Sequence, residues 1–126
     1  MAEVKKATFD TSTQEGKVKV FNAMNSTSES LKNVEHGHVI QVTDVLIYRD
    51  IVDSYGAETE SDVVVLFAKD DELGTRLYGS VSKTVSDSAD NLIDFISDTG
   101  LEEVGVKPIT QQSNNGRDFI SLQMVM

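Results

Sequence analysis

The stretch His38–Val52, HVIQVTDVLIYRDIV, decides how the rest of the sequence is interpreted. Its many β-branched residues predict one long, curved β-strand. The alternation is imperfect, because Ile40 and Val42 share one parity whereas Val45 begins a series of apolar residues on the other. A β-bulge near Thr43–Asp44 would explain the change, since one extra residue returns the apolar side chains to the same face.

Two more strands and a helix are predicted directly after this strand. Ser61–Ala68 is apolar on both parities, which is typical of a strand buried on both faces. Arg76–Ser82 is the next predicted strand. The period then changes, because apolar residues from Val85 to Ile96 fall on one helical stripe and aspartates fall on the opposite side. Gly100 lies where a helix is expected to end.

Val104–Thr110 and Asp118–Val125 are two further predicted strands at the end of the chain. From His38 onward the order is therefore strand, strand, strand, helix, strand, strand, which is the order of the OB-fold. We predict a mainly β fold, an OB-fold-like five-stranded barrel over residues 38–125 with one helix between strands 3 and 4. A mixed α+β sheet with the same order of elements is the alternative.

The first part of the chain is predicted to be an addition to this barrel. Extended segments at Val4–Asp10 and Lys17–Ala23 flank a polar turn, so we expect an N-terminal β-hairpin. The polar, serine-rich stretch Met24–Asn33 is expected to be a loop. Residues 1–126 would then form a single domain in which residues 1–33 are the hairpin and loop extension.

The length and composition agree with one globular domain and exclude several chemistries. The chain has 126 residues, of which 39% are hydrophobic and 25% charged. It contains no cysteine, which removes disulfides, a thiolate zinc site and a cysteine nucleophile. No apolar run approaches the roughly 20 residues of a membrane span, and the N-terminal lysines precede no apolar stretch of the kind found in a signal peptide. We therefore expect no membrane contact and no secretion.

No arrangement of residues predicts catalysis or a bound metal. His36 and His38 lie two residues apart, but no third ligand accompanies them. The acidic run at residues 70–72 lacks the alternating spacing of a calcium loop. Neither a glycine-rich phosphate loop nor a nucleophile motif occurs. We expect a protein that is not an enzyme and that uses no cofactor and no metal.

The net charge argues at first against a polyanionic partner. Eleven basic and twenty-one acidic residues give a formal charge of −10. More than half of this surplus lies in Thr84–Glu103, which carries acidic residues and no basic one. The remaining segments are close enough to balance for a local basic face to exist. We expect such a face to attract a polyanion weakly over long distances and to bind it with modest affinity.

Three predicted strands carry aromatic rings among cations and hydroxyl groups. On the side opposite to the apolar residues lie Arg76, Tyr78, Ser80 and Ser82 in one strand, Lys17, Lys19 and Phe21 in another, and Phe119 near Arg117 in the last. Binding of a single nucleic-acid strand uses this combination, because bases stack on rings and cations follow the phosphates. Packing in the core is the competing interpretation of each ring, and a solvated surface charge is that of each lysine.

Eight short segments, in register over nearly the whole chain, resemble a known family. They are KATFDT (6–11), EGKVKVFNA (15–23), KN (32–33), YG (55–56), LY (77–78), SKTV (82–85), LID (92–94) and FISLQ (119–123). Their order and spacing resemble those of the single-stranded DNA-binding protein of the small protein-primed Bacillus-type phages, the Salasmaviridae. The chain departs from this family at the polar stretch Met24–Glu29, which replaces a glycine-rich patch, and at Tyr78, which follows a longer turn and precedes Gly79.

The resemblance implies an OB-like protein that coats the strand displaced during protein-primed replication and shields it from nucleases and re-pairing. It implies single-stranded DNA as the partner, a functional link to the phage DNA polymerase, and action in the host cell cytoplasm. The family's stacking tyrosines fall by position on Tyr48, Tyr55 and Tyr78. Self-association along the DNA strand through the N-terminal segment is left as an open alternative.

Rings and cations together make up the expected DNA-binding site. The residues expected to stack bases are Tyr48, Tyr55 and Tyr78, then Phe21 and Phe119, and those expected to contact phosphates are Lys17, Lys19, Arg49, Arg76, Lys83 and Arg117. A rival hypothesis is an acidic DNA mimic that inhibits a DNA-binding protein through the stripe Asp87–Asp98. A third is a structural module whose sheet edge binds a protein partner.

Overall fold

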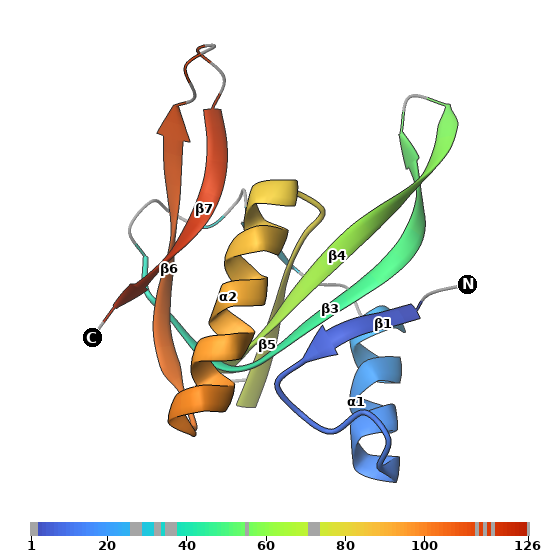
Figure 1. Cartoon of the computed structure of the whole chain (residues 1–126), viewed down its shortest axis with the longest axis vertical. Helices are drawn as coiled ribbons and strands as arrows, with labels where there is room; N and C mark the ends of the chain where they lie inside the picture. The colour runs from blue at the N-terminus through green and yellow to red at the C-terminus, as the bar shows by residue number, and fades with distance from the viewer. Residues whose placement is uncertain are drawn as a thin grey trace.

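The computed structural model describes residues 3–25, 29–31, 34, 38–54, 56–70, 74–112, 114, 116 and 118–125. Over these residues the chain is mainly β, with strands that curl into a half-barrel and two helices (Figure 1). The elements are β1 (Glu3–Ala7), α1 (Gln14–Asn25), β2 (Glu29–Ser30), β3 (Ile40–Ser54), β4 (Ala57–Asp70), β5 (Gly74–Ser80), α2 (Lys83–Thr99), β6 (Val104–Gln112) and β7 (Asp118–Val125).

The strands form one sheet in the order β2-β5-β4-β3-β6-β7, and β1 pairs separately with β3. The strand β3 is the centre of this arrangement, because it pairs with β4 over most of its length, with β6 through Ile40–Val42 and with β1 through Leu46–Arg49. The predicted order of three strands, a helix and two strands from residue 40 onward is confirmed. The predicted count of five strands and one helix falls short of the seven-stranded sheet and two helices that the structure contains.

The predicted bulge in the long strand is confirmed. The pairing of β3 with β4 shifts register between Val42 and Asp44. As a result Ile40, Val42 and Val45 all point into the same apolar cluster, although their spacing in the sequence places them on different parities. The bulge therefore lets one strand keep a continuous apolar face while it bends.

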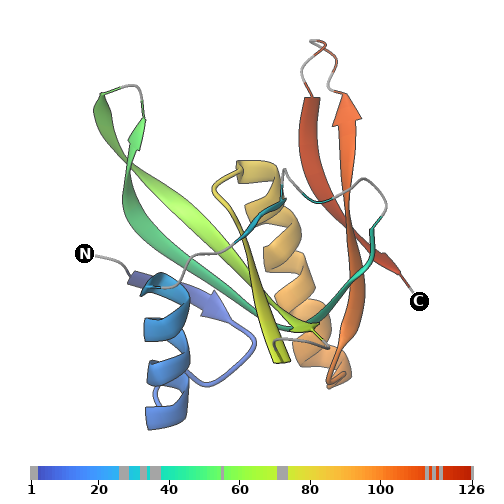
Figure 2. The ribbon, with the colours of Figure 1, turned by 180° about the vertical axis from the view of Figure 1, so that it is seen from behind.

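Two apolar clusters lie on opposite faces of β3 and β4, which explains why β4 is apolar on both parities, as predicted. The first, called here the α2 core, consists of Leu31, Ile40, Val42, Val45, Ile47, Val64, Leu66, Ala68, Tyr78, Val85, Ala89, Leu92, Ile93, Ile96, Val104 and Val106. The second, the α1 core, consists of Ala23, Leu46, Tyr48, Val65 and Phe67, with parts of β1 and α1 packed against them. The helix α2 covers one face of the sheet, and α1 lies on the other side (Figure 2).

The helix α2 forms where the apolar stripe predicted it. Its buried residues include Val85, Ala89 and Ile96, which lie on one side of the helix. Gly100 ends the helix in a left-handed conformation with φ of 69°, and its N–H group donates to the carbonyl of Ile96 at 2.8 Å. At the other end Ser82 is the N-cap residue, but its side chain makes no capping hydrogen bond.

The N-terminal hairpin prediction is wrong. Lys17–Ala23 lies in the helix α1 and not in a strand, and β1 pairs with β3 instead. The helix begins because the Thr13 side-chain oxygen accepts a hydrogen bond from the N–H of Gly16 at 3.0 Å, which caps the first turn. The alternating valines suggested a strand, but only Val20 of this alternation packs against the α1 core. The predicted loop Met24–Asn33 also changes, because it contains the end of α1 and all of β2.

Candidate nucleic-acid interface

Two of the three tyrosines expected to stack bases are buried. Tyr48 is 8% exposed in the α1 core, and Tyr78 is 7% exposed in the α2 core. The prediction that Tyr78 lies on the outward side of its strand is therefore wrong. The reason is that β5 is covered on both faces, since the neighbouring Leu77 packs against the α1 core. A base would reach either ring only after the side chains above it had moved.

The surroundings of Tyr48 support the interpretation that its ring packs in the core. Its parity matches that of Leu46, and both side chains lie in the α1 core. Burial raises the pKa of the Tyr48 phenol above its ordinary value, and the nearby negative charge of Asp50 raises it further. The remaining tyrosine, Tyr55, and the predicted phosphate contact Arg117 lie outside the described residues.

Residues 14–25 form a helix, and this separates side chains that a strand would have placed on one side. They are the ring of Phe21 and the cations of Lys17 and Lys19. Phe21 is 64% exposed and lines an open groove with Lys17 and Val18. Lys19 faces the body of the protein, where it pairs with Asp44 and its ammonium lies 4.8 Å from the centre of the Phe9 ring. Lys17 and Phe21 thus remain together on a surface, one helical turn apart, whereas Lys19 does not join them.

Two predicted residues on other strands lie apart from this groove. Phe119 is half-buried on β7, opposite Gln111 of β6. Arg76 of β5 lies 3.6 Å from a carboxylate oxygen of Glu29 in β2. The structure therefore does not place all the predicted rings and cations on one face.

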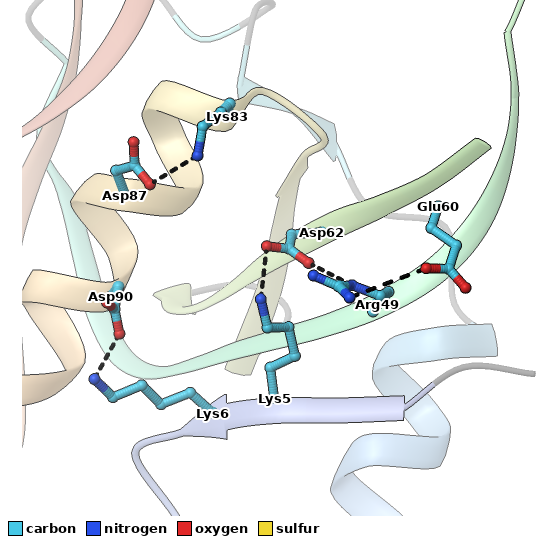
Figure 3. A network of polar contacts seen from close by, with 8 residues as sticks. All are labelled: Lys5, Lys6, Arg49, Glu60, Asp62, Lys83, Asp87 and Asp90. Carbon is cyan, nitrogen blue, oxygen red and sulfur yellow. Dashed lines mark hydrogen bonds and ion pairs between the residues drawn. The ribbon is translucent and has the colours of Figure 1, made fainter.

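A cluster of two cations, from β1 and β3, surrounds one carboxylate, Asp62 of β4 (Figure 3). Lys5 of β1 donates to Asp62 Oδ2 at 3.0 Å, and Arg49 of β3 donates from Nε to Asp62 Oδ1 at 3.3 Å. A guanidinium nitrogen of Arg49 also lies 4.0 Å from Glu60. The hydrogen bond from Lys5 and then that from Arg49 lower the pKa of Asp62 below its ordinary value, although partial burial opposes them.

A pocket of about 240 Å³ lies beside this cluster. It is lined by Arg49, Glu60, Ser61, Asp62, Val81, Lys83 and Ser86. Two of the cations predicted separately as phosphate contacts, Arg49 and Lys83, are brought to the same pocket by β3 and the start of α2. The Lys83 side chain is 89% exposed and lies 3.6 Å from Asp87, one helical turn along. This pocket is the place where the predicted cations converge best.

Sequence reasoning missed two lysines that join this surface. Lys5 and Lys6 of β1 both reach carboxylates on the α2 side of the sheet, because the register of β1 against β3 shifts between Val4 and Lys6 and places two neighbouring side chains on one side. Lys6 reaches Asp90 at 2.5 Å and Asp94 at 2.7 Å on α2, and these carboxylates raise its pKa. The adjacent pair of lysines was a signal in the sequence, but their partners lie more than fifty residues away.

Ion pairs with lysines reduce the negative charge of the acidic helix α2. Asp87, Asp90 and Asp94 each have a lysine partner, so part of the α2 stripe is neutralised within the chain. An uninterrupted negative surface is what a DNA mimic would need. The pairing therefore weakens the hypothesis of an acidic DNA mimic.

Comparison with known proteins places the chain in a family. The family model described as phage single-stranded DNA-binding protein matches residues 1–125, and the chain belongs to this family. Among its relatives are proteins named single-stranded DNA-binding protein from Bacillus phages PZA and phi29, each 40% identical over 119 residues, which is 94% of this chain and 93% of the relative. The protein of that name from Bacillus phage B103 is 35% identical over 120 residues, or 95% of both chains. No solved structure matches the chain significantly.

None of the helices in the described part of the chain is long and apolar enough to span a membrane.

Proposed function

We propose that this chain is a sequence-independent single-stranded DNA-binding protein that coats and protects the strand displaced during protein-primed replication of a phage genome. The observation that carries this proposal is the similarity over nearly the full length to relatives named for single-stranded DNA binding. It is a binding function, with no reaction for the chain to catalyse. We place its action in the host cell cytoplasm, where phage replication and the phage DNA polymerase would provide its context.

The order of the strands supports an OB-fold-like domain. The strands β5, β4, β3, β6 and β7 are neighbours in the sheet, and α2 connects β5 to β6. This is the strand order of an OB barrel. The barrel is open between β5 and β7, because no ladder joins these two strands among the residues that the structure describes. OB-folds bind oligonucleotides through their second and third strands and the adjacent loops. The corresponding strands here are β4 and β5, and Asp62 and its neighbouring pocket lie on β4.

The proposed path of the DNA follows the exposed cations. Arg49 and Lys83 would contact phosphates at the pocket, and Lys5 would join them. Lys17 with Phe21 on α1 offers a second place where a base could stack beside a cation. Tyr55 lies outside the described residues, and we keep it as a proposed stacking partner for a DNA base. Tyr48 and Tyr78 are weaker candidates because their rings lie in the two cores.

Titration with oligo-dT tests the function directly. The chain has three tyrosines and no tryptophan, so tyrosine emission reports on binding without interference. We expect labelled oligo-dT to gain anisotropy on binding and the same length of double-stranded DNA to bind much more weakly. Emission would be quenched if a base stacks on a tyrosine. The absence of any anisotropy change at low salt would refute the proposed function.

A further inference from the structure

We propose that the pocket at the start of α2 holds one phosphate of the bound DNA strand, and that Asp62 competes with this phosphate for its cations. In the free protein the carboxylate of Asp62 occupies the place of the phosphate among the cations. DNA binding is then an exchange of one anion for another. This inference rests on the proposed function, and it names Asp62 as the residue that limits the affinity of the protein for DNA.

The first observation is the way in which Asp62 is held. Its two carboxylate oxygens each accept a hydrogen bond from a different cation, Lys5 at 3.0 Å and Arg49 at 3.3 Å. The side chains of the three residues are 41%, 48% and 26% exposed for Lys5, Arg49 and Asp62. An oxyanion bridging two cations is also the arrangement in which proteins hold a phosphate. Because the cluster is open to solvent, a phosphate can approach the same donors.

The second observation is the unused anion-binding capacity at the start of α2. The first N–H groups of a helix lack partners within the helix, and its dipole favours an anion there. The side chain of Ser82 does not cap them, and the first turn of α2 contains no acidic residue. Arg49 and Lys83 line the pocket at this end of the helix. The first turn of α2 therefore offers N–H donors and positive potential, and the carboxylates that line the pocket, Glu60 and Asp62, come from β4.

The third observation is Ser86, which is only 8% exposed and lines the same pocket. Its hydroxyl forms no side-chain hydrogen bond with any residue in the described part of the chain. No fully buried side-chain oxygen or nitrogen in the described part of the chain lacks a partner, so the Ser86 hydroxyl is open to the pocket. A phosphate oxygen bound in the pocket could accept a hydrogen bond from it.

The acids in the pocket explain why the site is nearly balanced when empty of DNA. Glu60 and Asp62 line the pocket with Arg49 and Lys83, so opposite charges offset one another. Removing the Asp62 charge would release Lys5 and Arg49 and would remove a repulsion against phosphate. At about 4 Å in water, one unit charge is worth about 1 kcal/mol, which corresponds to about a fivefold change in affinity. The exchange thus predicts that an acidic residue limits the affinity of the protein for DNA.

The test compares Asp62→Asn with the matched control Asp98→Asn by anisotropy of labelled oligo-dT at several salt concentrations. Both variants change the net charge equally, but Asp98 lies near the far end of α2, about 22 Å from Lys83 along the helix axis. We expect Asp62→Asn to bind about fivefold more tightly than wild type. Asp98→Asn should change affinity by less than about twofold, because its charge is screened over that distance.

Two further variants examine the donors. Lys83→Gln removes a cation whose side chain is 89% exposed, so loss of folding is not expected. It should reduce the slope of log K against log salt by about 0.7, the contribution of one phosphate contact to a single strand. Ser86→Ala should weaken binding severalfold without changing this slope, because it removes a neutral hydrogen bond. Circular dichroism verifies that each variant is folded.

The outcomes separate this inference from the proposed function. Tighter binding by Asp62→Asn but not by Asp98→Asn, with a reduced slope for Lys83→Gln, would support the phosphate site. Equal effects of the two aspartate variants on affinity, or an unchanged slope of log K against log salt for Lys83→Gln, would overturn the phosphate site. If wild type still bound oligo-dT in that case, the proposed function would stand. Failure of wild type to bind oligo-dT would instead overturn the function and the site together.

Discussion

The substitution Tyr78→Ala distinguishes a core residue from a DNA-stacking residue. The side chain is 7% exposed and packs in the α2 core. An aromatic side chain buries about 150–250 Å², and about 25 cal/mol per Å² of apolar surface gives a stabilisation near 4–6 kcal/mol. Alanine retains part of this burial, so we expect the free energy of unfolding to fall by about 3–5 kcal/mol. That is a large share of the ~5–15 kcal/mol typical of a domain.

Urea unfolding followed by far-ultraviolet circular dichroism measures this loss. Phe21→Ala is the matched control, because its ring is 64% exposed on α1 and its removal should change stability by less than about 0.5 kcal/mol. The opposite pattern is expected for DNA binding if Phe21 stacks on a base, with a loss of about 1–3 kcal/mol in binding. A folded Tyr78→Ala variant of nearly wild-type stability that had lost oligo-dT binding would show that this ring belongs to the DNA site.

Three other expectations follow from single positions. Gly100→Ala should lower the free energy of unfolding by about 1 kcal/mol, because an alanine is strained at a φ of 69°. A Cβ at this position would contact nothing within 4 Å, so the backbone conformation is the whole cause. An unchanged melting temperature would contradict this expectation. Gly16→Ala should cost about 1–3 kcal/mol, because its Cβ would lie 1.9 Å from the Asp10 carbonyl oxygen, and thermal unfolding equal to wild type would show that the turn before α1 adapts freely. The lowered pKa of Asp62 means that its stabilising contribution is complete above the unfolded-state pKa and is lost as the pH falls through the lower folded-state pKa. Asp62→Asn should therefore flatten the decline of stability in acid, as measured by urea midpoints at a series of pH values, and an identical decline in both proteins would refute this assignment.

The distribution of charge reconciles an acidic chain with a DNA partner. Cations at the pocket and on β1 are balanced by nearby carboxylates, as Lys5 and Arg49 show with Asp62. Exposed ion pairs of this kind contribute little to stability, about 0–1 kcal/mol each. They are therefore easily exchanged for contacts with phosphate. A protein built in this way would bind DNA with a shallow dependence on salt, because few counterions are released.

Local periodicity in the sequence was enough to predict several elements of this fold. The apolar stripe from Val85 to Ile96 predicted α2, and Gly100 predicted its end, because both signals depend on neighbouring residues alone. The change of parity after Val42 predicted the bulge in β3 for the same reason. The order of elements from residue 40 onward followed from these local signals.

Tertiary packing decided which residues are accessible. The period-two pattern at Lys17–Ala23 favoured a strand, but a capped first turn and contact with the α1 core made it a helix. Parity placed Tyr78 on an outward face, yet both faces of β5 are covered by segments distant in sequence. The meeting of Lys5 with Asp62, which are 57 residues apart, is likewise a result of how β1 lies along β3. Contacts between distant segments leave no periodic trace in a single sequence, and so the position of the cations around the pocket could be known only from the folded chain.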